Sequence, residues 1–545
     1  MRILGISTLH DSSVAIIDNG KLEFFCKEER LSRKKRDKYP ILALEQALKK
    51  AKGKIDIVVI SSPTYKAEDN KYIEITVLKK INVPIVRLCN EHHLCHASLA
   101  FYNSGFKESL SCIIDRNGSL INGLRESETI FTSKYPCVFK PIYKTYWTLN
   151  NGVNNDVQNQ KNLTELMKPY PDCEAYADSS MNITKVYETA TTLIGQDALE
   201  NGKTMGLSAY GKDKKYVSLF TDNRPNSNIY HHEEDYNQQT ILKEHLHKKI
   251  NNLTEKQYEF YADHAFQVQK QTQEQVLKLI KRYVKKTGIK NVCLSGGYAL
   301  NVVTNEYLVK NLPDVNFYFE PLADDSGNSI GAALLIYYNE TRNTYKNKKN
   351  PLINTFFNNT KHKINVDGQN ISSKQIASHL SNGKIVAVYN GIAEAGPRAL
   401  GNRSILFDPR NKDAKKIINK VKRREWYRPF AVSILESFFT SYFVTHKLKK
   451  APFMTLSFQV KNNKIPGVVH VDNSCRVQTV SKEDGYFFDL LKEFNLITKI
   501  PALLNTSFNL AGEPLIETPK QAINCFYKSG IDILWFPEIK KGLIK

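Results

Sequence analysis

The segment between residues 394 and 430 combines arginines and lysines with glycines and prolines, and its residue types are those of an anion-binding site. Arginine forks match phosphate oxygens two at a time. Gly396 and Gly401 permit a close backbone approach to a ligand. The cations that we single out are Arg398, Arg403, Arg410, Lys422, Arg424 and Arg428.

An isolated run of Lys and Arg is more often a solvated basic face beside a turn. Here the arginines alternate with Gly, Pro and apolar residues instead of clustering on one polar helix face. Asn402 and Ser404 add hydrogen-bonding groups among them. The segment therefore predicts a site that handles anions.

A second set of residues has the types of metal ligands. His92 and His96 are four residues apart in EHHLCHASLAFY, so on a helix both imidazoles project from one face. Alone, such a pair is more often two surface or satisfied histidines. Asp115 ends the apolar strand SCIID, and Asp325 lies where a glycine-rich turn enters a helix, so both belong at the ligand edge of an α/β sheet. Two imidazoles and two carboxylates suit iron, zinc or manganese.

Two glycine-rich segments have weaker signals. LSGGYALNVVTN, from residue 294, predicts a strand, a Gly-Gly turn and a helix start, whose N–H groups suit a phosphate, although a tight connection is the commoner meaning. GKTMGLSAYG, residues 202–211, predicts a loop in which Lys203 and Tyr210 line a site.

Strand and helix patterns alternate along the chain and predict an α/β fold. Three alternating runs, RILGIST, SSVAIID and KLEFFCK, begin an antiparallel sheet, and Asn19-Gly20 is a two-residue hairpin signal. A helix at 41–52 leads to a buried parallel strand at 55–62, and a long amphipathic helix is predicted over 258–286. The segment 212–256 is polar with little periodicity. No internal sequence repeat is evident.

The length of 545 residues predicts two or three folding units. The polar stretch RNTYKNKKN precedes Pro351, so we place the main boundary there, giving domains 1–350 and 351–545. The nine scattered cysteines lack a C-x-x-C pair and are expected to be reduced. No apolar run is long enough to span a membrane and no secretory signal is visible, so we expect a cytoplasmic protein.

The net charge of +22 favours a polyanionic partner, although compositional bias toward Lys and Asn explains it as well. The last 165 residues, from Ser381, hold 26 basic and 14 acidic residues, which is more than half of the excess.

The chain resembles the O-carbamoyltransferase family that includes nodulation protein U, cephalosporin carbamoyltransferase and tobramycin carbamoyltransferase. The resemblance runs nearly end to end. It is carried by HDSS, EERLSRKK, EHHLCHAS, TMGLSAYG, LSGGYALN and DSGNSIGAA in the first part of the chain, and by GPRALGNRSIL, KRREWYRPFA, HVDNSCRVQTV and NTSFNLAGEPLIETP in the second. It implies an N-terminal actin-like ATPase (ribonuclease-H-like) domain and a C-terminal YrdC-like α/β domain.

The resemblance also implies a two-step reaction. Carbamoyl phosphate and ATP, with Mg2+, give carbamoyladenylate and pyrophosphate at the C-terminal site. An acceptor hydroxyl then attacks the carbamoyl carbon at an N-terminal metal site, which is commonly an iron site, and AMP leaves. Catalytic roles fall on His10, Arg398, Arg403, Lys422, Arg424 and Arg428, and metal ligation on His92, His96, Asp115 and Asp325. Binding of nucleotide or carbamoyl phosphate falls on Lys203, Gly296, Gly297, Asn301, Gly327, Asn402, Ser404, Asn505, Thr506, Ser507 and Asn509.

The acceptor is open at this point. The family modifies hydroxyls of antibiotics, sugars and lipo-oligosaccharides, whereas the charge favours a hydroxymethylated pyrimidine such as 5-hydroxymethylcytosine in DNA. One alternative is a threonylcarbamoyl-type tRNA-modifying enzyme, against which the fused C-terminal motifs argue. Another is a nucleic-acid-binding protein without activity, which the complete histidine and aspartate set makes improbable. The sequence does not predict the oligomeric state. After Asp115 it has Arg116, where the family pattern usually has glycine.

Overall fold

The computed structural model describes residues 1–64, 73, 81–148, 153–178, 182–214, 219–221, 224–225, 255–342 and 361–545. The chain separates into two compact units. Unit 1 comprises Met1–Glu28 and Arg36–Asn354, and unit 2 comprises Glu29–Lys35 and Thr355–Lys545. The predicted boundary between residues 350 and 351, and most of the polar segment 212–256, lie outside the described residues.

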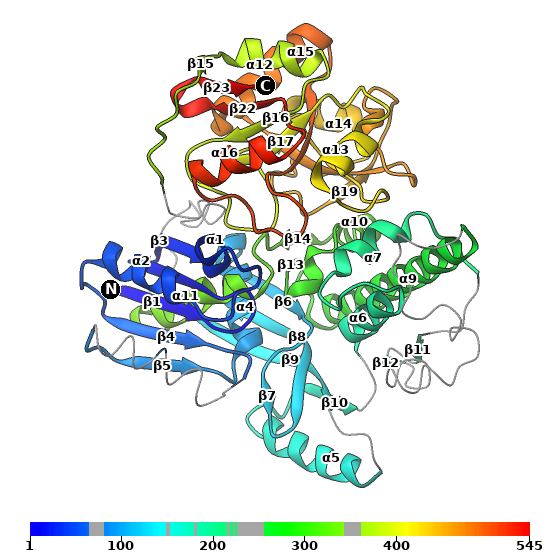
Figure 1. The fold of residues 1–545 in the computed structure, drawn as a ribbon. Helices are drawn as coiled ribbons and strands as arrows, with labels where there is room; N and C mark the ends of the chain where they lie inside the picture. The colour runs from blue at the N-terminus through cyan, green and yellow to red at the C-terminus, as the bar shows by residue number, and fades with distance from the viewer. Residues whose placement is uncertain are drawn as a thin grey trace. The chain divides into compact units, whose positions relative to one another are not determined.

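The first sheet of unit 1 has the order β3-β2-β1-β4-β5 (Figure 1). Its strands are β1 (Arg2–Ser7), β2 (Ser13–Asp18), β3 (Lys21–Lys27), β4 (Ile57–Ser61) and β5 (Ile85–Leu88). β1, β2 and β3 are antiparallel, and β4 and β5 continue the sheet parallel to β1. Asn19 and Gly20 join β2 to β3 with φ angles of 49° and 78°, as the hairpin prediction requires.

The second sheet of unit 1 repeats this topology. Its path is β10-β9-β8-β6-β13-β14, with β7 paired to β8. The strands are β6 (Glu108–Ile114), β7 (Leu120–Ile121), β8 (Leu124–Lys134), β9 (Val138–Thr148), β10 (Glu174–Asp178), β13 (Asn291–Ser295) and β14 (Asn316–Phe319). β6, β8 and β9 are antiparallel and β13 and β14 run parallel to β6. Two successive sheets of this kind are the arrangement of an actin-like ATPase, so the predicted fold class of this unit is confirmed.

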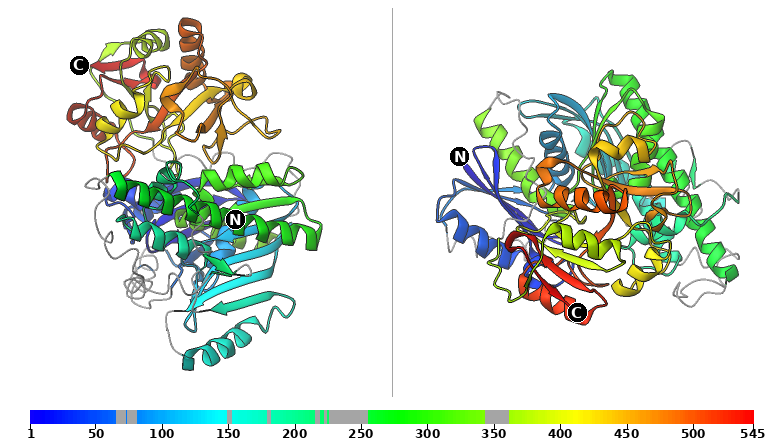
Figure 2. Two further views of the ribbon diagram at one scale, coloured as in Figure 1. Left: turned by 90° about the vertical axis from the view of Figure 1, so that its right-hand side faces the viewer. Right: turned by 90° about the horizontal axis from the view of Figure 1, so that it is seen from above.

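Helices cover these sheets and connect their strands. They are α2 (Ile41–Ala51), α4 (His92–Ser104), α5 (Val153–Met167), α6 (Ile183–Leu193), α7 (Asn201–Ser208), α9 (Glu255–Thr287), α10 (Val302–Asn311) and α11 (Asn328–Thr341). A two-stranded ribbon, β11 (Phe220–Thr221) with β12 (Arg224–Pro225), precedes α9. Figure 2 shows α9 as the long green helix.

Helices α4 and α11 pack against each other, α4 on the second sheet and α11 on the first. Glycines set this close packing. A Cβ atom at Gly331 would lie 2.0 Å from the Cys95 carbonyl oxygen, and one at Gly5 would lie 1.9 Å from that of Ser329. Because both contacts are with backbone atoms, larger side chains cannot be accommodated without moving the helices.

One local prediction is wrong. Residues 202–211 were expected to form a loop, but 201–208 are the helix α7. Thr204, Leu207 and Ser208 are buried and α7 packs on α9, so tertiary packing outweighs the low helix propensity of its glycines.

Unit 2 is built on a nine-stranded mixed sheet of order β15-β23-β22-β16-β17-β21-β18-β20-β19. Its strands are β15 (Gln369–Asn370), β16 (Val386–Tyr389), β17 (Arg403–Phe407), β18 (Ala431–Leu435), β19 (Ser457–Gln459), β20 (Ser474–Val480), β21 (Ala502–Ser507), β22 (Ile533–Phe536) and β23 (Lys541–Ile544). The helices are α12 (Ser373–Ser381), α13 (Ala414–Lys422), α14 (Phe439–Tyr442), α15 (Tyr486–Thr498) and α16 (Pro519–Lys528), with α1 (Glu28–Ser32) at the start of the segment 29–35. The α/β class predicted for this part of the chain is confirmed.

Two bulk expectations can be compared with the structure. The nine cysteines, all in the described part of the chain, form no disulfide, as expected of reduced thiols. Within the described ranges, none of the helices combines the length and apolar composition needed to cross a bilayer.

Candidate active sites

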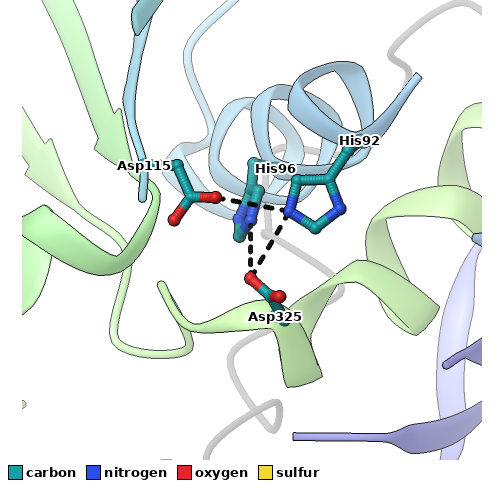
Figure 3. Close-up of side chains that lie close together, drawn as sticks. All are labelled: His92, His96, Asp115 and Asp325. Carbon is teal, nitrogen blue, oxygen red and sulfur yellow. Dashed lines mark ion pairs between the residues drawn. The ribbon is translucent and has the colours of Figure 1, made fainter. Parts of the chain in front are cut away.

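The structure brings His92, His96, Asp115 and Asp325 together in unit 1 (Figure 3). One potential ligand atom from each of the four lies within 4.8 Å of the others. His92 Nε2 is 3.5 Å from Asp115 Oδ2 and 3.4 Å from Asp325 Oδ1, and His96 Nε2 is 3.5 Å from the same Asp325 oxygen. All four side chains are almost fully buried.

The local fold explains this convergence. α4 begins at His92, so His96 follows one turn later on the same face. Asp115 directly follows β6, and its Oδ1 accepts a hydrogen bond from the Gly297 N–H at 3.0 Å. Asp325 opens the 3₁₀ turn before α11, and its carbonyl accepts a hydrogen bond from Ser7 Oγ at 3.1 Å. The start of α4, the end of β6 and the turn before α11 therefore supply the four side chains.

Opposite charges dominate the electrostatics of this cluster. Burial alone would lower the pKa of His92, but Asp325 and Asp115 outweigh it and raise the pKa to about 10. Burial would likewise raise the pKa values of the two aspartates, but the neighbouring histidines hold both well below their usual range. The group is therefore a buried set of ionised carboxylates facing imidazoles.

The arrangement fits a metal ion better than a hydrogen-bonded network. Separations of 3.4 to 3.5 Å are long for charged hydrogen bonds. They match the ligand–ligand edges of a coordination polyhedron with metal–ligand lengths of about 2.1 Å. His96 Nε2 is buried without a hydrogen-bond partner among the described residues, as expected of a nitrogen that ligates.

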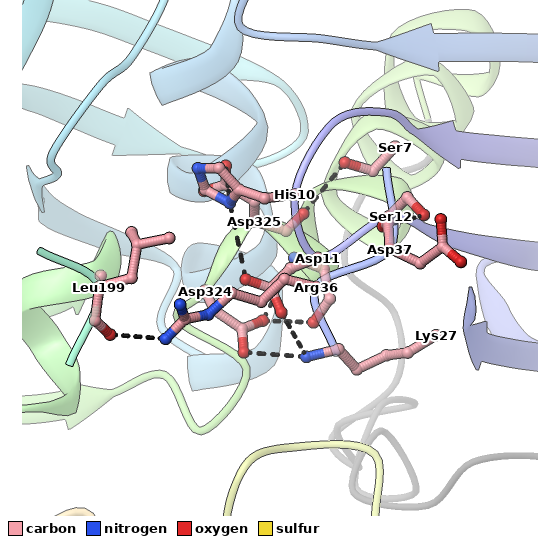
Figure 4. Close-up of polar contacts among 12 residues, drawn as sticks. Ser7, His10, Asp11, Ser12, Lys27, Arg36, Asp37, Leu199, Asp324 and Asp325 are labelled. Carbon is pink, nitrogen blue, oxygen red and sulfur yellow. Dashed lines mark hydrogen bonds and ion pairs between the residues drawn. The ribbon is translucent and has the colours of Figure 1, made fainter. Parts of the chain in front are cut away.

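His10 lies beside this cluster (Figure 4). Its Nδ1 is 3.6 Å from Asp325 Oδ2 and 3.6 Å from Asp11 Oδ2, and the ring is about one-third exposed. Asp325 is the largest cause that raises the pKa of His10 to about 9. His10 therefore lies at the edge of the cluster, with one nitrogen directed at carboxylates.

The ion-paired residues beside His10 were not among the predicted site residues. Lys27 Nζ lies 3.1 Å from Asp11 Oδ1 and 3.2 Å from Asp324 Oδ2, and its side chain is 4% exposed (Figure 4). A signal was present, since Lys27 follows the apolar residues Phe24, Phe25 and Cys26 at the end of β3, but its partners are 16 and 297 residues away.

The predicted glycine loops have mainly packing roles in the structure. Gly296 has φ 86° and a Cβ there would lie 2.5 Å from the Ile114 carbonyl oxygen, while Gly297 holds Asp115. Asn301 caps α10 by accepting the Thr304 N–H at 3.0 Å, and Gly327 abuts the Leu322 backbone. Gly297 and Gly327 thus lie beside Asp115 and Asp325 of the cluster, whereas Asn301 has a capping role.

Two cationic side chains of unit 1 are held by residues of α6 and of the connection between α6 and α7. Lys203, in α7, donates to Gln196 Oε1 at 3.0 Å and is ion-paired with Glu200, so it does not join the cluster of histidines and aspartates. Arg116, next to Asp115, forms a two-pronged ion pair with Glu188 of α6. The bulky side chain that replaces the family's usual glycine is thus directed toward α6.

In unit 2, four cations lie close together: Lys422, Arg424, Arg428 and Arg476. Burial lowers the pKa of Lys422 well below its usual value, and Arg424 and Arg428 lower it further. Burial lowers the pKa of Arg476 to about 10, with a further contribution from Arg428. Glu425, 3.4 Å from Arg428 Nη1, supplies a counter-charge. A cluster of this sign and burial is stabilised by an anionic ligand.

Lys422 links this cluster to the end of β21. Its Nζ lies 2.5 Å from the Ser507 carbonyl oxygen and donates to Asn509 Oδ1 at 3.0 Å. The structure thus brings together the two distant predicted groups, the Lys/Arg run and the Asn505–Asn509 segment. Arg476 was missed by the sequence reasoning. It lies on β20 within HVDNSCRVQTV, and its pairing with Ala431 on β18 places it near Arg428.

Other predicted residues of unit 2 are placed differently. Arg403 is fully buried, and its terminal nitrogens donate to carbonyl oxygens of Asn390, Gly391, Asn402 and Glu517, with the guanidinium over the Tyr389 ring. Arg398 is half-buried in the loop between β16 and β17, and Arg410 is ion-paired with Asp408. Arg403 therefore supports this loop instead of joining the four cations.

The remaining amides and hydroxyls lie on or beside the central strands. Asn402 bridges to the Ile392 carbonyl oxygen at 2.9 Å, and Ser404 Oγ accepts the Gly401 N–H at 3.1 Å. Asn505 Nδ2 donates to Ser433 Oγ at 2.9 Å, and its Oδ1 is buried without a hydrogen-bond partner among the described residues. Thr506 is buried on the same strand.

Comparisons with known proteins identify the family of this chain. Family models described as carbamoyltransferase N-terminus and carbamoyltransferase C-terminus match residues 2–62 with 44–334, and 377–541, respectively. An uncharacterized protein of Methanocaldococcus jannaschii is 32% identical over 84% of this chain and 74% of its own. Nodulation protein NolO of Bradyrhizobium diazoefficiens is 28% identical over 81% of this chain and 76% of its own.

A similar solved structure is full-length HypF in its phosphate- and nucleotide-bound form. It is 13% identical, with a TM-score of 0.39, over 62% of this chain and 55% of that protein. The two family models together span most of this sequence. The chain belongs to the carbamoyltransferase family and is a carbamoyltransferase.

Proposed function

We propose that this enzyme is an ATP-dependent O-carbamoyltransferase that works in two steps, one in each unit. The observation that carries the proposal is the separation of chemistry between the units. The four-cation cluster around Lys422 lies in unit 2, and the cluster of two histidines and two aspartates lies in unit 1.

In the first step, carbamoyl phosphate and water give carbamate and orthophosphate. A carbamate oxygen then attacks the α-phosphorus of ATP, the bond to the β-phosphate breaks, and pyrophosphate leaves with Mg2+. Lys422, Arg424, Arg428 and Arg476 bind the phosphates and stabilise charge that develops during nucleotidyl transfer. Ser507 and Asn509, which hold Lys422, orient its ammonium group.

In the second step, the acceptor hydroxyl attacks the carbamoyl carbon of carbamoyladenylate and the bond to AMP breaks. His92, His96, Asp115 and Asp325 would hold a metal ion, for which we propose Fe2+ over Zn2+ or Mn2+, and such an ion supplies Lewis acidity toward the adenylate phosphate. His10 Nδ1 faces two carboxylates, which favour a proton on that nitrogen. With a metal ion on Asp325, the carboxylate charge that raises the pKa of His10 would be offset, and Nε2 of the ring in its neutral form is then the nitrogen that accepts the hydroxyl proton.

The acceptor that we propose is a hydroxymethylated pyrimidine in DNA, such as 5-hydroxymethylcytosine. The exposed side of α13 supports it. This side carries basic residues at helical spacing, namely Lys416, Lys420 and Arg423, and Lys412 lies one turn earlier. Asp413 is the one acidic residue between positions 412 and 423. Two exposed aromatic side chains add to this surface. Trp426, 52% exposed, lies three residues after Arg423 in the chain. Tyr527, 64% exposed, precedes Lys528, whose carbonyl oxygen accepts a hydrogen bond from Arg423. Lysines bind phosphates and aromatic rings stack on bases.

The experiment supplies purified enzyme with ATP, Mg2+, Fe2+ and carbamoyl phosphate, and offers hydroxymethylcytosine DNA, unmodified DNA or an aminoglycoside. Pyrophosphate release reports the first step and mass spectrometry of the acceptor reports the second. Asp325→Asn is expected to retain pyrophosphate release and lose transfer, whereas Lys422→Met is expected to lose both.

A double variant tests the acceptor separately. Lys416→Glu with Lys420→Glu is expected to retain pyrophosphate release and to lose transfer to DNA, most strongly at higher salt. Transfer to the aminoglycoside but to neither DNA would replace the proposed acceptor with a small-molecule hydroxyl. If neither pyrophosphate nor a carbamoylated product is formed, the two-step proposal is wrong.

A further inference from the structure

Residues Glu29–Lys35 belong to unit 2 although they lie early in the chain. Arg30, in α1, is 2% exposed. Its Nη2 donates to the carbonyl oxygens of Gly396 at 3.1 Å and Ala395 at 3.5 Å, in the loop that carries Arg398. Its Nε and Nη1 are buried and have no hydrogen-bond partner among the described residues. The carboxylate of Glu29 lies 3.7 Å from Nε, beyond hydrogen-bonding distance.

Arg33, three residues later, is a natural comparison. Its Nη1 donates to the Leu515 carbonyl oxygen at 2.7 Å and its Nη2 to that of Pro514 at 2.8 Å. Both terminal nitrogens of Arg33 therefore attach the segment to unit 2. In Arg30 only Nη2 donates to the protein, so Nε and Nη1 can donate to another acceptor.

A buried carboxylate with a similar feature lies on the same loop. Glu394 Oε1 accepts N–H groups of Leu400 and Asn402 at 2.7 Å each, whereas Oε2 is buried without a hydrogen-bond partner among the described residues. Glu394 Oε1 also accepts the Arg403 N–H at 3.2 Å, and Arg30 donates to the carbonyl of Ala395, the residue after Glu394, so both side chains contact the same loop. A ligand that satisfies both must carry acceptor oxygens for Arg30 and N–H donors for Glu394.

The strand and loop that follow Asn505 connect this place to the four-cation cluster. Lys422 contacts Ser507 and Asn509 at one end, and Arg33 contacts Pro514 and Leu515 further along. The chain between them is held by hydrogen bonds from the Phe508 N–H to the Arg403 carbonyl and from the Ile516 N–H to the Phe508 carbonyl. The loop that Arg30 contacts and the site of Lys422 are thus joined through one short stretch of chain.

We propose that Arg30 binds the carbamoyl end of carbamoyl phosphate, with Nε and Nη1 donating to its oxygens while Glu394 Oε2 accepts from its amide. The inference rests on the proposed function and adds a substrate-binding residue to unit 2 from an early part of the chain. A carbamoyl group has both the acceptor oxygen and the N–H donors that the two side chains require. Phosphate alone would satisfy Arg30 but not Glu394.

The test compares full-length wild type with Arg30→Lys, Arg30→Gln and the matched control Arg33→Lys. Pyrophosphate release is measured while carbamoyl phosphate and ATP are varied separately, and binding of carbamoyl phosphate is measured by calorimetry without ATP. For both Arg30 variants we expect the KM and Kd for carbamoyl phosphate to rise about 10- to 100-fold, as for loss of hydrogen bonds to a charged group. The KM for ATP should stay within about twofold, and Arg33→Lys should change neither constant to this extent.

A purely structural role of Arg30 would produce a different pattern. Thermal stability would then fall in the Arg30 and Arg33 variants alike, and the KM values for both substrates would change together, which would overturn the inference. Unchanged carbamoyl phosphate binding in Arg30→Gln would overturn it as well. If wild type binds carbamoyl phosphate through Arg30 but releases no pyrophosphate, the proposed function fails and the binding role of Arg30 stands.

Discussion

Two buried glutamates on β8 are expected to respond to pH in opposite ways. Glu126 is 1% exposed and its carboxylate lies 2.5 Å from Lys144 Nζ. Glu128 is 3% exposed, and its carboxylate accepts hydrogen bonds from the Ile183 N–H and the Thr145 hydroxyl. The two side chains therefore lie on the same strand and are similarly buried, but only Glu126 has a cationic partner.

This difference separates their pKa values. Burial raises the pKa of Glu128 from 4.5 to about 7, and its hydrogen bonds offset burial only in part. Burial acts in the same direction on Glu126, but Lys144 and His93 outweigh it and lower the pKa to about 2. Each change corresponds to about 3 kcal/mol of folding free energy, of opposite sign.

The signs follow from proton binding. Folded Glu128 binds its proton more tightly than the unfolded chain, so its contribution to stability is present below pH 4.5 and is lost as the pH rises through about 7. Folded Glu126 binds its proton more weakly, so its contribution is present above pH 4.5 and is lost as the pH falls through about 2. Between pH 5 and 8, only Glu128 should therefore add a slope.

The experiment replaces each glutamate with glutamine. Relative to wild type, Glu128→Gln should gain up to about 3 kcal/mol of stability between pH 5 and 8. Glu126→Gln should be destabilised by a nearly constant amount, about 3 kcal/mol or more, because it leaves Lys144 buried without its partner. Since the two units need not unfold together, we would measure hydrogen exchange of β8 and β9 amides, corrected for the intrinsic pH dependence. Parallel pH profiles for the two variants would refute the reasoning.

Three further changes have equally definite outcomes. His96→Ala should lose at least 10-fold in metal affinity while retaining its fold, as measured by metal content after dialysis against graded chelator. Lys422→Met should lower pyrophosphate release by about 100-fold or more, with a compensating gain in thermal stability because a buried cation is removed; unchanged release would contradict its role. Gly331→Ala should lower the unfolding temperature measurably, because the new Cβ would lie 2.0 Å from the Cys95 carbonyl oxygen; Gly53→Ala, whose Cβ meets no atom within 4 Å but whose φ is 75°, is the control for backbone strain alone.

The sequence predicted the parts of the fold that depend on local patterns. Hydrophobic alternation and Asn19-Gly20 were sufficient for the first hairpin, and the spacing of apolar residues was sufficient for α9. The loop predicted at 202–211 was wrong because burial of α7 against α9 decides that segment, and a glycine count contains no information on that contact. The repeated topology of the two sheets of unit 1 was also not visible, since pairing order can persist without residue similarity.

The candidate sites show the same division between local and distant information. His92 and His96 were recognisable from helical spacing, and Asp115 and Asp325 from their positions after a strand and before a helix. Arg403 was predicted to belong to the anion site, yet its side chain contacts carbonyl oxygens away from the cation cluster. The contacts of Arg403 depend on which face of β17 its side chain occupies. A one-residue change of strand register would move the side chain to the other face.

Residues that complete a site from a distant part of the chain are the hardest to predict. Arg476 lies near the cation cluster because β20 pairs with β18. Arg30 lies in the segment Glu29–Lys35, which belongs to unit 2 although it comes more than 300 residues before the rest of that unit. Both lie in motifs that carry the family resemblance, but the motifs do not show what either side chain contacts, and only burial and contacts in the structure do. A cation that is buried beside other cations, or that keeps part of its hydrogen-bonding capacity, is costly unless a ligand compensates. In a chain with 77 basic residues, that cost distinguishes candidate functional arginines more sharply than the net charge does.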